Sequence, residues 1–277
     1  MEYSAIFFGL ISAVTWGAGD FSGGMAVKRT NPYGVVIAAH AISLVLLSVL
    51  GIVTGESVPP LRDWLWGGAA GICGGMGLAL LYSALASGQM SIAAPVSALV
   101  AAALPVLVGF FSEKLPGRSV LIGFILALTA VWLISGGVGL DFQPKKLRLP
   151  FLAGVGFGLF FIFLHQGSSS SIFWTLVATR IASISSLLIF SVVTRQPWIP
   201  TRDSWLPIFI SSLLDSAGNA FYALSARMGR MDVAAVLGSL YPGSTVLLAW
   251  FILKERISPL QMVGILIALA AIVLITL

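Results

Sequence analysis

The chain has 277 residues, of which 58% are hydrophobic and only 9% are charged, whereas roughly 25% of the residues in an ordinary soluble domain carry a charge. This composition excludes a soluble globular domain and indicates a protein embedded in a lipid bilayer. The formal net charge of +5 is what Lys and Arg in loops beside a membrane produce, so it predicts no nucleic-acid partner.

Apolar runs of about 20 residues, long enough to cross the hydrocarbon core as a helix, follow one another along the chain. A transmembrane β-barrel would instead show segments of about ten residues that alternate between apolar and polar, and the sequence has no such pattern. We therefore predict an all-α membrane protein with ten transmembrane helices. The predicted spans cover residues 5–27, 33–54, 64–87, 91–111, 118–138, 149–167, 172–194, 205–226, 232–252 and 258–277.

The first span contains Trp16 and Asp20 within the glycine-rich sequence WGAGDFSGG. An ionisable side chain inside a bilayer is costly and seldom persists without a partner or a function. A carboxylate in this place can hold a proton and a cationic substrate group in alternation, so Asp20 is the first candidate for substrate binding or coupling, and Trp16 is a second. The alternative for Asp20 is a structural ion pair, for example with Arg180.

The second, third and fourth spans contain fewer polar residues. His40 is expected to have a structural role, and Tyr82 is a candidate for substrate contact. Pro95 and Pro105 lie in the fourth span, where proline removes a backbone donor and kinks a helix. We expect these two positions to act as gates or as static kinks.

The sixth and seventh spans each contain one ionisable side chain in an otherwise apolar run. His165 is expected to line the same cavity as Asp20 from the second half of the chain, with a hydrogen bond to the backbone as the alternative. Arg180 lies near the middle of its span, and its guanidinium cannot be discharged. We favour a clamp between helices, with Asp215 as one possible partner, over recognition of a substrate carboxylate.

The eighth and ninth spans carry the remaining candidates. Asp215, Asn219 and Tyr222 are spaced by four and three residues, so they share one helical face. This polar stripe predicts one wall of a cavity, although a stripe of this kind also holds helices together. Tyr241 and Pro242 are expected to interrupt the ninth helix and to free a backbone carbonyl, as a hinge or a polar site within the membrane requires.

The second half of the sequence repeats the first at an offset of 140 residues. PPLRDWL at residues 59–65 corresponds to IPTRDSW at residues 199–205. With the same offset, Ser43 falls on Ser183. This shared register indicates an internal duplication.

Each half contains five predicted spans, and an odd number of crossings makes the second half enter the membrane from the opposite side. Secondary transporters are commonly built from such inverted repeats, with a substrate site near the midplane between the halves. We therefore predict two inverted five-helix repeats, residues 1–140 and 149–277, joined by a linker at residues 141–148.

Short motifs accompany this five-plus-five layout: Trp16-Gly17 in the first span, Leu240-Tyr241-Pro242 in the ninth, and SEKLP and LKERIS after the fourth and ninth. In order and spacing they resemble the EamA family of the drug/metabolite transporter superfamily. The resemblance implies a proton-linked or facilitative carrier of small metabolites, often an exporter. The family commonly places an arginine in the second span, where the first half of this chain has His40 and the second half has Arg180.

We accordingly expect a secondary transporter that exports a small amino-acid-like or drug-like metabolite by alternating access, with proton coupling as an option and without a cofactor or a metal. The expected partners are the lipid bilayer and a small-molecule substrate, with the chain a monomer or a homodimer in the bacterial cytoplasmic membrane. A nutrient or sugar importer of the same fold is the alternative.

An intramembrane protease is the competing class. Residues 17–20 spell GxGD, the active-site pattern of intramembrane aspartyl proteases, but that chemistry needs two facing carboxylates. Asp215 alone stands within a span as a second carboxylate, and it follows the motif where those proteases have it precede. We therefore do not expect an enzyme.

Two arguments predict opposite orientations of the chain in the membrane. Loops on the side of the termini carry five Lys or Arg and loops on the other side carry nine. The positive-inside rule therefore places the termini outside, whereas the family resemblance implies termini inside.

Overall fold

The computed structural model describes residues 3–86, 90–112, 116–134, 144–254 and 258–276. This part of the chain is helical and contains no strand. The helices are α1 (Tyr3–Val27), α2 (Pro32–Val53), α3 (Leu61–Ala86), α4 (Met90–Ser112), α5 (Arg118–Ile134), α6 (Pro144–Gly167), α7 (Phe173–Val193), α8 (Trp205–Met228), α9 (Met231–Gly238), α10 (Tyr241–Leu253) and α11 (Pro259–Thr276), with the short 3₁₀ helix η1 (Arg202–Ser204) before α8.

Within these described ranges, six helical segments are long and apolar enough to cross a bilayer, and three more apolar helices are shorter. Each predicted span coincides with a helix, apart from the ninth, which consists of α9 and α10. The predicted interruption before Pro242 is confirmed, since α9 ends at Gly238 and α10 begins at Tyr241.

In the fourth span, α4 continues without a break through Pro105, and the role of Pro105 as a gate or a static kink stays a prediction. Pro105 has no N–H to donate to the carbonyl of Ala101. Helix α6 packs closely against that carbonyl through Gly158, where an added Cβ would lie 3.2 Å from the Ala101 oxygen. Helices α4 and α6 are therefore closely packed one turn before Pro105. The side chain of Pro95 lies outside the described part.

The expected linker at residues 141–148 is described only in part. Helix α6 begins at Pro144, so residues 144–148 are helical, and residues 141–143 lie outside the described ranges.

Helices α2 and α7 end in the same way, as expected for a repeat. Gly55 and Arg195, which are 140 positions apart, both have left-handed backbone conformations, with φ of 67° and 56°. Their N–H groups donate to the carbonyls of Ile52 and Val192, the equivalent residues one turn earlier. The same αL termination therefore occurs in both halves, with glycine in one and arginine in the other.

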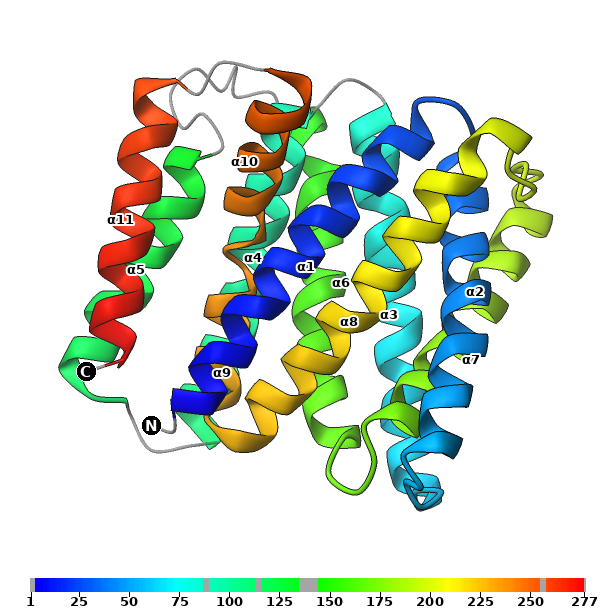
Figure 1. Ribbon diagram of the computed structural model, residues 1–277, viewed down its shortest axis with the longest axis horizontal. Helices are drawn as coiled ribbons and strands as arrows, with labels where there is room; N and C mark the ends of the chain where they lie inside the picture. Colours follow the sequence, from blue (N-terminus) through cyan, green and yellow to red (C-terminus); the bar gives the residue numbers. More distant parts are fainter. Residues whose placement is uncertain (1–2, 87–89, 113–115, 135–143, 255–257, 277) are drawn as a thin grey trace.

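Helix packing follows an approximate two-fold axis between the halves. Helix α1 packs along α8, and its counterpart α6 packs along α3, while α2 packs against α7 and α5 against α11. Figure 1 shows α1 and α6 running in opposite directions, and the labelled termini lying at the same end of the bundle. This exchange of equivalent contacts is what an inverted repeat produces.

Small residues bring the two halves into close contact. An added Cβ on Gly71 of α3 would lie 2.1 Å from the carbonyl oxygen of Thr179 on α7, and one on Gly156 of α6 would lie 2.7 Å from the carbonyl oxygen of Cys73 on α3. In a bilayer, helices associate through such close backbone packing rather than through a hydrophobic driving force.

Loops of the two halves also meet at both ends of the bundle. The Glu56 carboxylate accepts hydrogen bonds from the backbone N–H of Phe173, at 2.8 Å, and from the Ser171 hydroxyl, so it caps the N-terminus of α7. At the opposite end, the Arg29 guanidinium donates to the backbone carbonyl of Asp203 at 2.9 Å.

Candidate functional site

A cavity lies between the two halves, lined by residues of α1–α4, of α6–α8, of α10 and of the turn between α9 and α10. Its volume is about 70 Å³, which exceeds the minimum of roughly 10–15 Å³ that a single water needs. Its polar lining consists of Trp16, Asp20, His40, Thr179, Arg180, Ser183, Asp215, Asn219, Ser239 and Tyr241.

Arg180 is buried on α7, and its guanidinium is directed at three acceptors. Its Nε donates to Ser43 Oγ at 2.7 Å, its Nη1 to His40 Nε2 at 3.2 Å, and its Nη2 to Asp215 Oδ2 at 2.6 Å. These partners lie on α2 and α8, so the arginine connects three helices. The clamp between helices that the sequence favoured for Arg180 is present in this geometry.

The hydrogen bonds of His40 determine its protonation state. A guanidinium can only donate, so His40 Nε2 accepts from Arg180 and carries no proton. The proton is then on Nδ1, which donates to Ser183 Oγ at 2.7 Å. His40 is therefore neutral, and its 3.9 Å approach to Asp215 is not an ion pair.

Four of these residues are related by the repeat. His40 and Arg180 are equivalent at the offset of 140, and so are Ser43 and Ser183. Arg180 donates to Ser43, and His40 donates to Ser183. The approximate two-fold axis therefore passes between His40 and Arg180, which contact each other.

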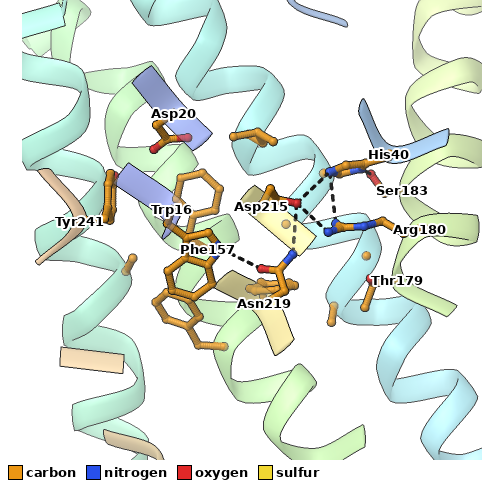
Figure 2. Close-up of a pocket in the computed structure, with 18 of the residues that line it drawn as sticks. Trp16, Asp20, His40, Phe157, Thr179, Arg180, Ser183, Asp215, Asn219 and Tyr241 are labelled. Atoms are coloured by element: carbon orange, nitrogen blue, oxygen red, sulfur yellow. Dashed lines mark hydrogen bonds and ion pairs between the residues drawn. The ribbon is translucent and has the colours of Figure 1, made fainter. Parts of the chain in front are cut away.

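Asp215 and Asn219 extend the network along α8 toward α1. The indole N–H of Trp16 can only donate, and it donates to Asn219 Oδ1 at 3.0 Å. This contact orients the amide so that Asn219 Nδ2 donates to Asp215 Oδ2 at 3.2 Å. A continuous chain of hydrogen bonds thus runs from Arg180 to Trp16 (Figure 2).

Aromatic rings form the adjacent wall. Trp16 and Phe161 are stacked with their centroids 5.4 Å apart, and Tyr222 stacks behind Phe161 at 4.7 Å. The Tyr222 hydroxyl donates to the backbone carbonyl of Phe161 at 3.0 Å. Tyr222 therefore supports the wall from behind, and Phe157 and Phe160 extend it along α6.

Asp20 lies on the α1 side of the cavity, away from the Arg180 cluster (Figure 2). Tyr82 is a neighbour of this carboxylate, and its hydroxyl packs against Gly23, where an added Cβ would lie 2.0 Å from the Tyr82 oxygen. Among the described residues, no Lys, Arg or His comes within 4.0 Å of the Asp20 carboxylate. The titratable neighbours of Asp20 are therefore the hydroxyls of Tyr82 and Tyr241 and the carboxylate of Asp215, and not cations.

The structure brings most of the predicted site residues to one place. Trp16, Asp20, Asp215, Asn219 and Tyr241 line the cavity, and Tyr241 also contacts Ser97 through its hydroxyl at 3.2 Å. The residues predicted as structural, His40 and Arg180, line it as well.

Three predicted residues lie elsewhere. Tyr82 and Tyr222 are fully buried behind the lining, and His165, near the end of α6, is not among the lining residues. Sequence reasoning did not select Ser43, although its equivalence with Ser183 was visible. The phenylalanines of α6 had no signal that distinguished them from lipid-facing ones.

The arrangement does not match an aspartyl protease. Asp215 directs its carboxylate toward Arg180 and Asn219, and Figure 2 shows this carboxylate facing away from Asp20. In the described part of the chain, no cluster of His, Cys, Asp and Glu could hold a metal ion.

Apolar helices of membrane-spanning length, packed around an interior polar cavity, define an integral membrane protein. Residues 3–136 and, separately, residues 147–277 match the EamA-like transporter family. The chain therefore belongs to this family, whose members are transporters, and it has the two-repeat architecture of the family.

No curated protein matches the chain. A solved structure described as "Crystal structure of protein" is similar to it with a TM-score of 0.81 and 15% sequence identity, over 99% of this chain and 96% of that chain. At this level of identity the likeness concerns the fold alone.

Proposed function

We propose that the protein is a secondary transporter that moves a small amino-acid-like or drug-like metabolite by alternating access, with ten membrane passes in two inverted repeats. The observation that carries the proposal is the position of the cavity, which lies on the approximate two-fold axis and is lined by both halves. Exchange of conformations between inverted halves opens such a central site to each side in turn.

Export, proton coupling and residence in the bacterial cytoplasmic membrane are further parts of this proposal. The resemblance to exporters favours outward movement. Asp20 supports coupling, because it is a carboxylate in the cavity whose described neighbours include no cation, and such a group can carry a proton through the cycle.

The test is counterflow with the purified full chain in proteoliposomes. Vesicles loaded with an unlabelled amino acid, amine, sugar or nucleoside are diluted into a trace of the same labelled compound, and transient label uptake identifies a carried solute. A pH-sensitive dye inside the vesicles reports coupled proton movement. Absence of counterflow for every member of a panel that covers these classes would refute the proposal.

Direction is tested separately in cells. Expression of an exporter lowers the internal concentration of the identified solute, whereas an importer raises it. The Asp20→Asn variant is expected to lose proton movement, and unchanged coupling in this variant would remove Asp20 from the mechanism.

A further inference from the structure

The charges of the cavity restrict which solutes it accepts. Among the described lining residues, the charged side chains are Asp20, Asp215 and Arg180, since His40 is neutral. Arg180 is neutralised by Asp215 at 2.6 Å, and its remaining nitrogens are directed at Ser43 and His40. A substrate carboxylate that took Arg180 would have to displace Asp215 and leave that carboxylate unpaired.

Asp20 presents the opposite situation. The titratable groups that face it are Tyr82 on α3, Asp215 on α8 and Tyr241 on α10, and none of them is a cation. A lone ionised carboxylate in such a low-dielectric interior is very costly. The site is therefore satisfied in two ways, by a proton on Asp20 or by a positive charge from a solute.

The walls beside Asp20 favour a particular solute body. Trp16 lies one helical turn from Asp20, and Phe157 and Phe161 face the same cavity. Aromatic faces attract organic cations through their quadrupole and bury apolar groups. A positive group near Asp20 with an apolar or aromatic body against this wall satisfies both features.

We infer that the solute is an organic ammonium compound with an apolar or aromatic body and no carboxylate, and that it exchanges one for one with the proton of Asp20. When the ammonium binds, the O–H bond of Asp20 breaks and the proton leaves to water on the same side of the membrane. When the ammonium is released on the other side, a proton from that side binds Asp20. The charge in the cavity is the same in both states. This inference rests on the transport function proposed above.

The first experiment compares three compounds that share the indole ring and differ in the charged groups of the side chain: tryptamine has an ammonium, tryptophan an ammonium and a carboxylate, and indole-3-acetate a carboxylate. Binding to the purified full chain in detergent is measured by calorimetry, and proton release by an indicator in weak buffer. We expect tryptamine to bind at least tenfold more tightly than the other two and to release one proton for each molecule bound. Tryptophan binding as tight as tryptamine binding, or tryptamine binding without proton release, would overturn the inference.

Variants locate the proton. Asp20→Asn is expected to abolish the release and to weaken tryptamine binding at least tenfold, and Asp20→Glu to retain the release. The matched control is Asp203→Asn, the same change on an exposed loop carboxylate, which should preserve both. If Asp20→Asn does not fold, the inference is still tested by the comparison of the three indole compounds on the wild type and by proton release from Asp20→Glu.

The two proposals fail separately. Counterflow of tryptophan or of a sugar, without binding of tryptamine, would leave the transport function standing and refute the ammonium class. Failure of every solute in counterflow would refute transport itself, together with the exchange that rests on it.

Discussion

The ion pair between Arg180 and Asp215 gives the sharpest test of the central network. Removal of one partner of a buried ion pair generally costs about 3–5 kcal/mol of unfolding free energy, because the other charge remains buried and unpaired. Arg180 also donates to Ser43 and His40, so Arg180→Met removes three hydrogen bonds. We therefore expect Arg180→Met to lower the unfolding free energy by an amount near the upper end of this range, about 4–5 kcal/mol.

The assay is unfolding of the purified protein by SDS titration in mixed micelles, followed by circular dichroism. Asp215→Leu should cost about 3 kcal/mol, because Arg180 keeps its bonds to Ser43 and His40. The double variant should cost less than the sum of the two single variants by about 2 kcal/mol or more, since no unpaired charge remains. Ile181→Met, at a neighbouring position that is 46% exposed, is the control and should be near neutral.

Two results would refute this reasoning. If Arg180→Met stayed within about 1 kcal/mol of the wild type, the guanidinium would not be part of the structural clamp. If the losses of the single variants simply added in the double variant, the two side chains would not be coupled. Either result would return Arg180 to the role of a receptor for a substrate carboxylate and would weaken the argument for an ammonium solute.

Three further predictions concern other contacts, measured by the same unfolding assay. Gly71→Ala should lower the unfolding free energy by about 2–3 kcal/mol, because its Cβ would lie 2.1 Å from the carbonyl oxygen of Thr179. Gly68→Ala is the control and should be tolerated, since the nearest atom to its Cβ would be 3.9 Å away. Equal losses in the two variants would contradict the close packing of α3 on α7. Glu56→Gln should cost about 1 kcal/mol by weakening the N-terminal cap of α7, and no loss would show that the cap contributes nothing. His40→Arg should lower the unfolding free energy by about 3 kcal/mol or more, because it adds an unmatched buried charge, and His40→Gln should lower it less. A larger loss for His40→Gln than for His40→Arg would contradict a neutral histidine.

The sequence was sufficient for the helices because their signals are local. Runs of about 20 apolar residues and the Tyr241-Pro242 pair specify where each helix lies and where the ninth span breaks. The fourth span shows the limit of this reasoning. Pro105 and Pro242 carry the same local signal, but α4 is continuous at Pro105 whereas the ninth span is interrupted just before Pro242, and the sequence around each proline does not distinguish the two outcomes.

The candidate site was partly visible for a similar reason. Charged residues are rare within the spans, so Asp20, Arg180 and Asp215 could be selected, whereas the choice of Asp215 as the partner of Arg180 depends on how α7 and α8 lie beside each other. His165 was placed in the cavity by an alignment at an offset of 145. A shift of five residues from the main register turns a helix position by more than a full turn, which is enough to move a side chain out of the cavity.

The repeat also explains why the site has to be asymmetric. A residue beside the approximate two-fold axis contacts the equivalent residue of the other half, as His40 and Arg180 do at 3.2 Å. An arginine at both position 40 and position 180 would therefore place two guanidiniums next to each other. Asp215 has no counterpart carboxylate in the first half, since the equivalent position is Gly75, where an added Cβ would lie 2.0 Å from Ser183 Oγ.

A single cation therefore occupies the axis, matched by a single carboxylate from the second half. In the proposed cycle, the two halves exchange their backbone arrangements around Arg180, while this arginine stays paired near the axis of exchange. Among the described lining residues, the first half contributes Asp20 and no cation. In this proposal the symmetry of the fold supplies the movement, and the departure from symmetry at residues 40 and 75 leaves the Asp20 carboxylate to bind the proton and the solute.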